Sequence, residues 1–210
     1  MKVYAALTFD DGYLTHSNIA YLLYKQGIRA TFFIITHLKK FENKPLLTIN
    51  PRGIQLISDM GHEIGSHSCT HPFLDRIPMS RVEQELRESK LYLERLIGKE
   101  VKGFAYPYGS YNKSIISVVR KFYRYARLGG RRFEAKTWNA YKLSSFMIEG
   151  ITPKELVKFP IKYILYKNIR PVLIFHDEPI KFILNIIKIL QGIGVEFITL
   201  SELVDIMFSN

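Results

Sequence analysis

The stretch Val3-Tyr4-Ala5-Ala6-Leu7-Thr8-Phe9-Asp10-Asp11-Gly12 opens the chain with a short apolar run that ends in two carboxylates and a glycine. Such a run is typical of a strand that is buried on both faces, as in a parallel sheet. The polar turn behind it lies at the carboxyl end of the strand, where α/β proteins gather functional side chains. Asp10 and Asp11 are therefore the first candidates for a functional site.

The rest of the chain repeats this alternation of strand and helix about seven times, without a linker or a change in composition. The apolar patterns predict further strands at 30–35, 63–66, 103–106, 125–128, 171–175 and 196–199. They predict helices at 18–26, 50–60, 80–97, 112–122, from 152 onward, 180–190 and 201–208. Asn50 is the expected N-cap of the second helix, a capping box from Ser80 to Glu83 opens the third, and Gly98 ends it.

This alternation predicts a single α/β domain over residues 1–210, with a parallel sheet that is either open or closed as a barrel. Residues 129–150 depart from the alternation, and we interpret them as an irregular insertion. Composition agrees with a globular domain, because 47% of the 210 residues are hydrophobic and 23% are charged. These values exclude a disordered chain and a disulfide-stapled mini-protein.

Cysteine content, the length of apolar runs and the net charge indicate where the protein works and what it contacts. The single cysteine, Cys69, cannot form an internal disulfide. No apolar run approaches the length of a membrane span, and no signal peptide is visible, so we expect no transmembrane segment and a cytoplasmic location. The net charge of +11 suggests a negatively charged partner or surface.

Three polar clusters fall at predicted strand ends: Asp10 with Asp11, His67 with His71, and His176 with Asp177. Two imidazoles and one carboxylate can hold a divalent metal ion with open coordination positions. Adjacent side chains at a strand end point in different directions, so one aspartate can bind metal while the other transfers a proton. The pattern leaves open which aspartate does which.

A single histidine is more often structural than a ligand, and we place His16, His37 and His62 mainly in that class. Two aspartates before a glycine are most often only a turn. The coincidence of all three clusters at strand ends nevertheless favours a metal-dependent hydrolase.

Several segments resemble the motifs of the polysaccharide deacetylase family, which is also described as the NodB-homology domain or carbohydrate esterase family four. Thr8-Phe9-Asp10-Asp11-Gly12 is similar to the first motif, and His67-Ser68-Cys69-Thr70-His71 to the second. Phe104-Ala105-Tyr106-Pro107-Tyr108-Gly109 is similar to the third motif, and Leu173-Ile174-Phe175-His176 to the last. The resemblance covers nearly the whole chain and implies a distorted (β/α)₇ barrel.

The resemblance also implies a function and a role for each residue. The family's activity would be hydrolysis of the acetamide of N-acetylated sugars, in a glycan or in a lipid-linked or nucleotide-linked sugar. Asp11, His67 and His71 would bind a divalent metal, most often zinc, with cobalt, nickel or manganese as alternatives. Asp10 would be the general base that acts on a water activated by the metal. His176 would be the general acid, and the backbone N–H of Tyr108 would stabilise the oxyanion.

Two family features are missing from the matching positions. Ala105 stands where the family often has an arginine that orients the base, although a branch with the Phe-Ala-Tyr-Pro-Tyr-Gly motif also lacks it. No aspartate lies between Asp75 and Asp177, where the family often supplies one to orient the acid histidine. Asp75 and Glu134 are candidate substitutes.

Three alternatives to a deacetylase follow from the same sequence. A cyclic amide or imide hydrolase of the same fold is one, and a non-catalytic glycan-binding relative is another. The third alternative is nucleic-acid binding through the basic stretch 120–136, but no nucleic-acid-binding motif accompanies it. We expect that stretch to be a solvated face or a contact for an anionic surface.

Overall fold

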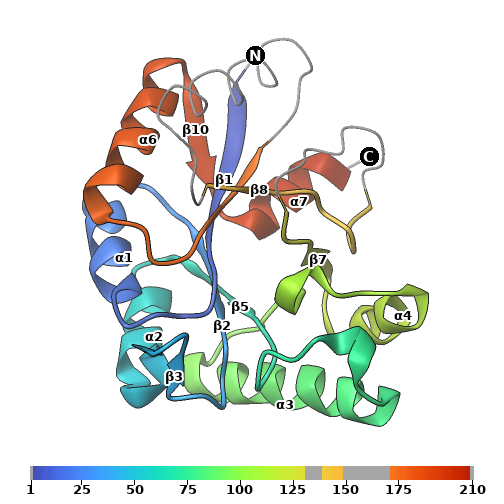
Figure 1. Cartoon of the computed structure of the whole chain (residues 1–210). Helices are drawn as coiled ribbons and strands as arrows, with labels where there is room; N and C mark the ends of the chain where they lie inside the picture. The colour runs from blue at the N-terminus through green and yellow to red at the C-terminus, as the bar shows by residue number, and fades with distance from the viewer. Residues whose placement is uncertain (1, 131–138, 149–170, 209–210) are drawn as a thin grey trace.

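The computed structural model describes residues 2–130, 139–148 and 171–208, and these residues form a curled, mainly parallel α/β fold (Figure 1). Its main sheet contains β1 (Val3–Phe9), β2 (Thr31–Ile34), β5 (Glu63–Ser66), β6 (Gly103–Ala105), β7 (Tyr125–Arg127), β8 (Phe146–Met147), β9 (Val172–Phe175) and β10 (Val195–Ile198). The strand order is β7-β6-β5-β2-β1-β9-β8, and β10 also pairs with β1. Every pairing in this sheet is parallel.

Helices surround the outer side of the curled sheet. They are α1 (His16–Lys25), α2 (Arg52–Asp59), α3 (Met79–Ile97), α4 (Lys113–Phe122), α6 (Ile180–Gly192) and α7 (Leu200–Phe208). Apolar side chains between the strands and these helices form the main core, where Phe9 stacks between Phe32 and Phe175 at centroid distances of 4.8 and 5.3 Å. Burial of such aromatic side chains is a large share of the stabilisation of the fold.

The segment 140–148 closes much of the gap between β7 and β9. The amide of Leu143 donates to the carbonyl of Ala126 at 3.0 Å, and the amide of Ile148 donates to Ile174 at 3.0 Å. Strand β8 lies within this segment and pairs with β9. The distorted barrel is thereby confirmed, but the interpretation of 129–150 as wholly irregular is wrong for Phe146–Met147, whose two-residue strand is too short to give a periodic signal.

The predicted strands match the observed ones to within a residue at most ends, whereas the starts of α1, α2 and α3 differ from the prediction by one or two residues. Helix α1 begins at His16 rather than at 18. Helix α3 begins directly after Pro78, and no side chain caps it; Ser80 lies inside its first turn. Helix α2 likewise has Pro51 rather than Asn50 at its N-cap. Gly98 does end α3, in the left-handed conformation with φ of 66°. The helix predicted from 152 onward lies outside the described residues.

A hairpin that the sequence pattern did not predict follows β2. It consists of β3 (Lys40–Phe41) and β4 (Lys44–Pro45), joined through Glu42 and Asn43, which both have positive φ. Two consecutive positive φ angles are typical of the tight turns that connect hairpin strands. The hairpin brings Phe41, Glu42 and Lys44 to the rim of the central cavity.

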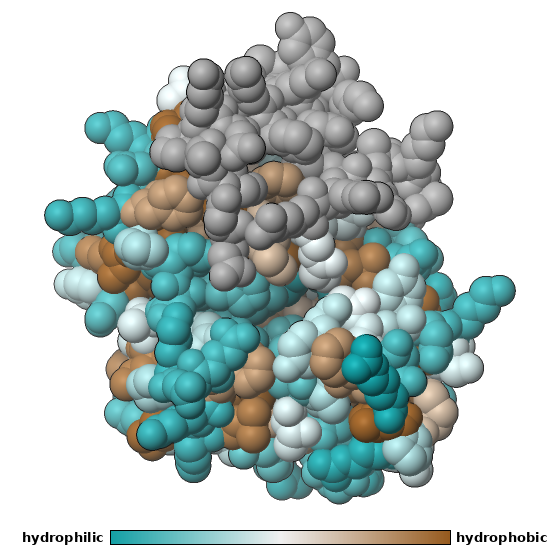
Figure 2. Space-filling view, in the orientation of Figure 1, coloured by the Kyte–Doolittle hydropathy of each residue, from teal (hydrophilic) through white to brown (hydrophobic). Residues whose placement is uncertain are grey.

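On the face shown in Figure 2, hydrophilic side chains predominate and apolar ones form scattered groups between them. Among the helices of the described ranges, none combines the length and the apolar character that a bilayer crossing requires.

Candidate active site

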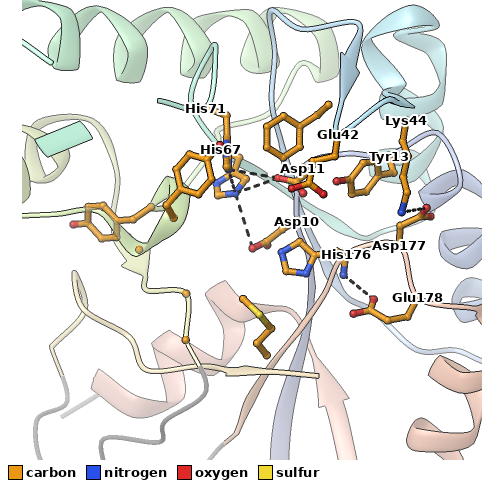
Figure 3. A pocket seen from close by; sticks show the side chains of 17 residues that line it. Asp10, Asp11, Tyr13, Glu42, Lys44, His67, His71, His176, Asp177 and Glu178 are labelled. Atoms are coloured by element: carbon orange, nitrogen blue, oxygen red, sulfur yellow. Dashed lines mark hydrogen bonds and ion pairs between the residues drawn. The ribbon is translucent and has the colours of Figure 1, made fainter. Parts of the chain in front are cut away.

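A cavity of about 450 Å³ opens at the carboxyl ends of the parallel strands (Figure 3). Asp10 and Asp11 enter it from β1, His67 and His71 from the loop after β5, and His176 from the end of β9. Parallel strands bring their carboxyl ends to one edge of a sheet, and this geometry joins residues that are more than 150 positions apart. The structure therefore places all three predicted polar clusters in one cavity.

The backbone separates the two adjacent aspartates. The amide of Asp10 donates to the carbonyl of Phe175 at 2.9 Å, so Asp10 still continues the pairing of β1 with β9. Asp11 has a φ of 70°, in the left-handed region that aspartate tolerates better than most residues. Its carboxylate turns toward His67 and His71, whereas that of Asp10 lies closer to His176.

Asp11, His67 and His71 form a compact set of potential metal ligands. The two Nε2 atoms lie 3.1 Å apart, and Oδ1 of Asp11 lies 3.6 Å from Nε2 of His67 and 3.5 Å from Nε2 of His71. A tetrahedral zinc ion with ligands at 2.0–2.1 Å requires ligand atoms about 3.3 Å apart. The observed triangle fits this requirement, with open coordination positions toward the cavity.

Burial and mutual proximity set the protonation of these three ligands. Burial lowers the pKa of His67 to about 4, and burial together with the neighbouring His67 lowers the pKa of His71 to about 2. Both imidazoles are therefore neutral at physiological pH, which is the form that binds metal. Burial and the charge of Asp10 raise the pKa of Asp11 to about 7. A bound cation would offset the cost of burying this carboxylate.

Hydrogen bonds behind the ligands fix their orientation. Nδ1 of His67 donates to the carbonyl of Ala105 at 2.8 Å, so that Nε2 carries the free lone pair that faces Asp11. The amide of His71 donates to Oγ of Ser68 at 3.0 Å. Ser68 and His71 both have positive φ, so the short loop between the two histidines has a tightly defined backbone.

Helix α3 holds this loop through a buried carboxylate that sequence reasoning did not single out. Oε2 of Glu85 accepts from the amides of Cys69 and Thr70, both at 2.8 Å, and Oε1 accepts from the Thr70 hydroxyl at 2.8 Å. Arg81 pairs with the same carboxylate at 2.9 Å. Glu85 thus anchors the stretch that joins the two predicted metal ligands.

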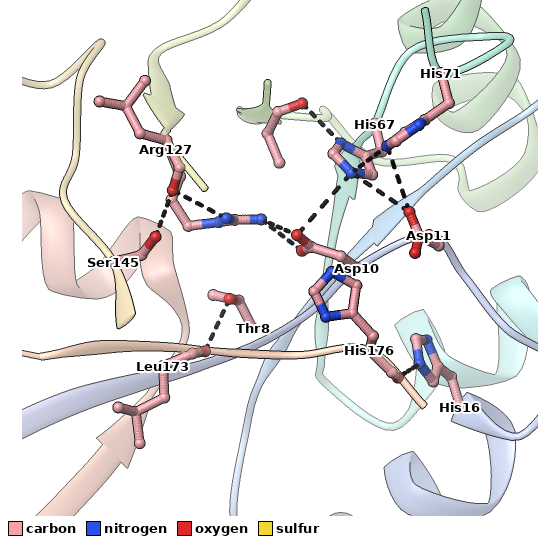
Figure 4. Close-up of polar contacts among 12 residues, drawn as sticks. Thr8, Asp10, Asp11, His16, His67, His71, Arg127, Ser145, Leu173 and His176 are labelled. Carbon is pink, nitrogen blue, oxygen red and sulfur yellow. Dashed lines mark hydrogen bonds and ion pairs between the residues drawn. The ribbon is translucent and has the colours of Figure 1, made fainter. Parts of the chain in front are cut away.

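Arg127 at the end of β7 holds the candidate base Asp10 (Figure 4). Its Nη2 lies 2.5 and 2.6 Å from the two carboxylate oxygens of Asp10, and only 1% of Arg127 is exposed. Burial acts to raise the pKa of Asp10, but the charge of Arg127 and its hydrogen bonds to the carboxylate outweigh it, and the pKa lies below its usual value. Asp10 is therefore an anion at neutral pH.

The position of Arg127 accounts for the arginine that is missing at Ala105. Ala105 and Arg127 are register partners on the paired strands β6 and β7, so both side chains point to the same face of the sheet. A charged residue within the predicted buried strand 125–128 was a signal that sequence reasoning could have used, because a buried charge requires a partner. Inclusion of Arg127 in a solvated basic stretch 120–136 is wrong.

The loop that carries His176 is fixed by several neighbours. Nε2 of the buried His16 donates to the His176 carbonyl at 2.5 Å, and Glu178 accepts from the His176 amide at 2.7 Å. Asp177 accepts from Thr15 at 2.5 Å and pairs with Lys44 at 2.9 Å. Among the described residues, Nδ1 of His176 has no hydrogen-bond partner.

Aromatic side chains line the rim next to the metal ligands. Tyr108 has a φ of 55° and packs edge-on against His71, at a centroid distance of 4.4 Å. The exposed ring of Tyr108 also stacks on Phe73 at 4.0 Å, and Phe41 contacts His71 from the hairpin. These rings shield the candidate metal ligands and give the cavity an apolar wall.

Other predicted residues have structural partners. The ring of His62 bridges the amide of Ala30 and the carbonyl of Ala20, which fits the structural role expected of it. Asp75 accepts from Ser110 at 2.5 Å, so its carboxylate is engaged outside the cavity rather than with His176. Glu134, the other candidate substitute, lies outside the described residues.

Two arginines of the basic stretch also have specific partners. Arg124 pairs with Asp205 at 3.2 Å, and the guanidinium of Arg120 lies 4.5 Å from the centre of the Tyr141 ring. Residues 131–138 of the stretch lie outside the described residues. Contact with an anionic surface stays a prediction.

Comparison with known families identifies the class of protein that this fold and cavity define. The profile of the family described as polysaccharide deacetylase matches residues 2–126, which is more than half of the chain. The chain therefore belongs to the polysaccharide deacetylase family, a family of hydrolases.

Individual relatives are similar over about half of the chain. A chitooligosaccharide deacetylase from Azorhizobium caulinodans is 32% identical over 120 residues, which cover 55% of this chain and 52% of that protein. A peptidoglycan-N-acetylglucosamine deacetylase from Bacillus cereus is 31% identical over 111 residues, 51% of this chain and 37% of that protein. The matched regions span about a fifth to a half of these and similar curated relatives.

Solved structures with the same fold cover nearly the whole chain. The carbohydrate esterase family 4 domain of a multidomain xylanase, from the hindgut metagenome of Trinervitermes trinervoides, has a TM-score of 0.70 and 22% identity. That match covers 98% of this chain and 91% of the other. A family 4 pseudoenzyme from Bacillus anthracis has a TM-score of 0.73 and 19% identity, over 97% of this chain and 66% of the other. At these identities the likeness establishes the fold alone.

Proposed function

We propose that this domain hydrolyses the acetamide of N-acetylated sugars, in a glycan or in a lipid-linked or nucleotide-linked sugar. The observation that carries the proposal is the division of two adjacent carboxylates between two environments. Asp11 lies with His67 and His71 in a triangle that fits a metal ion, and Asp10 lies against Arg127 as an anion. Two carboxylates whose pKa values differ in this way are suited to two different roles.

A divalent ion held by Asp11, His67 and His71 supplies a Lewis acid, which acidifies water and polarises a carbonyl group. Zinc suits the imidazole and carboxylate donors best, and cobalt, nickel and manganese accept the same set. The ligand geometry leaves room on the cavity side for water and for a carbonyl oxygen of the substrate.

The residues around the ligands carry the proton transfers. Asp10 accepts the proton of the attacking water, and Arg127 keeps the carboxylate oriented and charged for this step. The water oxygen bonds to the acetyl carbon, and the C–N bond breaks. His176 donates a proton to the nitrogen as this bond breaks, so that the nitrogen leaves as an amine and the acyl group as acetate.

Two further contributions come from the cavity wall. The backbone N–H of Tyr108 is assigned to the oxygen of the carbonyl group, where negative charge develops in the transition state. The exposed ring of Tyr108, which lines the cavity, offers an apolar contact for a sugar ring, and Phe73 supports it from behind by stacking. The names of several relatives, a chitooligosaccharide deacetylase and peptidoglycan deacetylases that act on N-acetylglucosamine or on N-acetylmuramic acid, support an N-acetylated glycan as substrate.

The test is acetate release from N-acetylglucosamine oligomers by protein that has been stripped of metal and then given one equivalent of zinc. Wild type should release acetate, and Asp10→Asn should lose about 10²–10⁴-fold in kcat, since the general base is removed. Asp59→Asn, on the exposed face of α2, is the matched control and should keep full activity.

Three results would contradict the proposal. Full activity of Asp10→Asn would show that Asp10 is not the base. Binding of the oligomers without turnover under any divalent metal would indicate a glycan-binding relative of the family. Turnover of cyclic amides or imides in place of acetylated sugars would indicate the alternative hydrolase.

A further inference from the structure

A second cluster of metal-binding side chains lies behind the loop that carries the catalytic ligands. It consists of His37, Cys69 and Glu88, each of which offers one donor atom within 4.8 Å of the other two. His37 follows the end of β2, Cys69 lies between His67 and His71, and Glu88 lies on α3. None of the three belongs to the catalytic set.

The backbone that presents these side chains is firmly held. The amide of His37 donates to the carbonyl of Cys69 at 2.9 Å, which extends the pairing of β2 and β5 beyond the strand ends. The amide of Cys69 is held by Glu85, and Glu88 lies three positions further along the same helix, hence on the same face. The three donors are thus brought together by elements that are already fixed by other contacts.

Solvent reaches this cluster through a cleft on the outer side of the domain. The cleft has a volume of about 420 Å³ and is lined by His37 and Glu88 together with Leu91, Tyr92, Arg95 and Leu96. His37 is exposed, Glu88 is half-buried and Cys69 is buried. An ion that enters from the cleft meets His37 and Glu88 first, because Cys69 is buried and does not line the cleft. A water molecule in the cleft can complete its coordination.

We propose that His37, Cys69 and Glu88 bind a second, thiophilic divalent ion such as zinc. One imidazole, one thiolate and one carboxylate are donors that zinc and cobalt accept, whereas magnesium and calcium prefer oxygen alone. Burial raises the pKa of the Cys69 thiol to about 12, so the ion itself has to displace the thiol proton to solvent. The thiol then gives up its contact with the Glu85 carbonyl. The ion then links the end of β2, the loop between His67 and His71, and α3.

The second cluster should bind more weakly than the catalytic one. Its donor atoms are separated by up to 4.8 Å, compared with 3.1–3.6 Å in the catalytic triangle and about 3.3 Å in an ideal tetrahedral site. Side-chain rotation has to close this difference. We therefore expect the second equivalent of metal to bind after the first.

Titration with cobalt(II) tests the proposal, because Cys69 is the single cysteine of the chain. A thiolate bound to cobalt gives a near-ultraviolet charge-transfer band, which ligation by imidazole and carboxylate alone does not. Wild type should bind two equivalents, with the band rising during the second. Cys69→Ser and His37→Ala should bind one equivalent without the band, and His37→Ala, which lies outside the loop between His67 and His71, should keep acetate release.

Asp11→Asn separates this proposal from the proposed function. It weakens the catalytic cluster, and asparagine tolerates positive φ, so the variant should lose acetate release and keep the band. Absence of the band in wild type at millimolar cobalt, or a band that is unchanged in His37→Ala, would overturn the second site. A normal band in a wild type that releases no acetate would overturn the proposed function alone.

Discussion

Replacement of Arg127 by alanine should impair both folding and catalysis, because it leaves Asp10 charged and buried without its partner. The guanidinium is 1% exposed and contacts both oxygens of the carboxylate. With about 4 Å between the centres of charge and an effective dielectric constant of about 20, the attraction is about 4 kcal/mol. Removal of one partner of a buried pair destabilises proteins by about 3–5 kcal/mol, which agrees with this value.

The catalytic effect follows from the same loss. Without Arg127 the pKa of Asp10 rises, because burial is then opposed by fewer positive charges, and the carboxylate also loses its orientation. We expect kcat to fall by about 10²-fold, less than in Asp10→Asn, with a smaller change in KM. The acidic limb of the pH profile of kcat/KM should move to higher pH.

Two further variants distinguish positioning from general destabilisation. Arg127→Lys keeps the charge but lacks the planar group, so its activity should lie between those of Arg127→Ala and wild type. The double variant A105R/R127A moves the arginine to the register partner of position 127 on β6. We expect its kcat to be at least about tenfold higher than that of R127A, because groups that transfer protons contribute about 10²–10⁴-fold to the rate.

The assay is acetate release under saturating zinc, with urea unfolding of each variant to measure stability. An Arg127→Ala protein that is folded and keeps the kcat and the pH profile of wild type would refute the assigned role. A double variant that is folded but no more active than Arg127→Ala would show that the strand of origin matters as much as the charge.

Two other predictions concern residues behind the cavity. Glu85→Gln should lower zinc affinity by about 10–100-fold in a competition titration, because the loop between the candidate metal ligands loses hydrogen-bond acceptors. The control Glu83→Gln, at an exposed position of the same helix, should leave the affinity unchanged. Equal affinities of the two variants would contradict the anchoring role of Glu85. Burial lowers the pKa of His16 to about 4 from 6.5, so the unfolded chain binds this proton first as the pH falls. His16 alone should therefore contribute a loss of stability of about 3 kcal/mol between pH 6.5 and 4. His16→Gln should show a shallower decline in urea midpoints over that window, and an identical decline would contradict it.

The strand-end clusters could be predicted from sequence because their placement follows from a local rule. A buried strand followed by a polar turn needs no knowledge of distant contacts, and parallel topology then gathers the ends. On that basis Asp10, His67 and His176 were expected at one edge, where the structure has them. The assignment of metal ligand and base to the two aspartates required the resemblance to the family, because periodicity alone cannot show which way each carboxylate turns.

Features that depend on pairing between distant segments could not be predicted. The contact of Arg127 with Asp10 requires the register of β6 and β7 and the curl of the sheet, neither of which is encoded in a local pattern. The anchoring role of Glu85 could not be predicted either, because in the sequence of α3 it is one of several charged residues, and the others are exposed or half-buried. The starts of α2 and α3 differ by one or two residues because helix ends fray and a sequence pattern does not fix the terminal residue, and neither Asn50 nor Ser80 caps its helix in the structure.

In this chain the arginine that contacts Asp10 is Arg127 on β7, whereas the family often has it at the position of Ala105 on β6. This difference affects how an active site is judged from motifs. Register partners on neighbouring parallel strands lie about 4.8 Å apart, which is less than the length of an arginine side chain. A guanidinium can therefore reach the same carboxylate from either strand. A motif that considers position 105 alone would report the positive charge as missing, although Arg127 supplies it in the cavity. The same reasoning does not extend to His176, whose Nδ1 has no partner among the described residues. Under the proposed function, His176→Ala should therefore lower kcat much more than it changes KM, and equal changes in the two constants would contradict the assignment of His176 as the general acid.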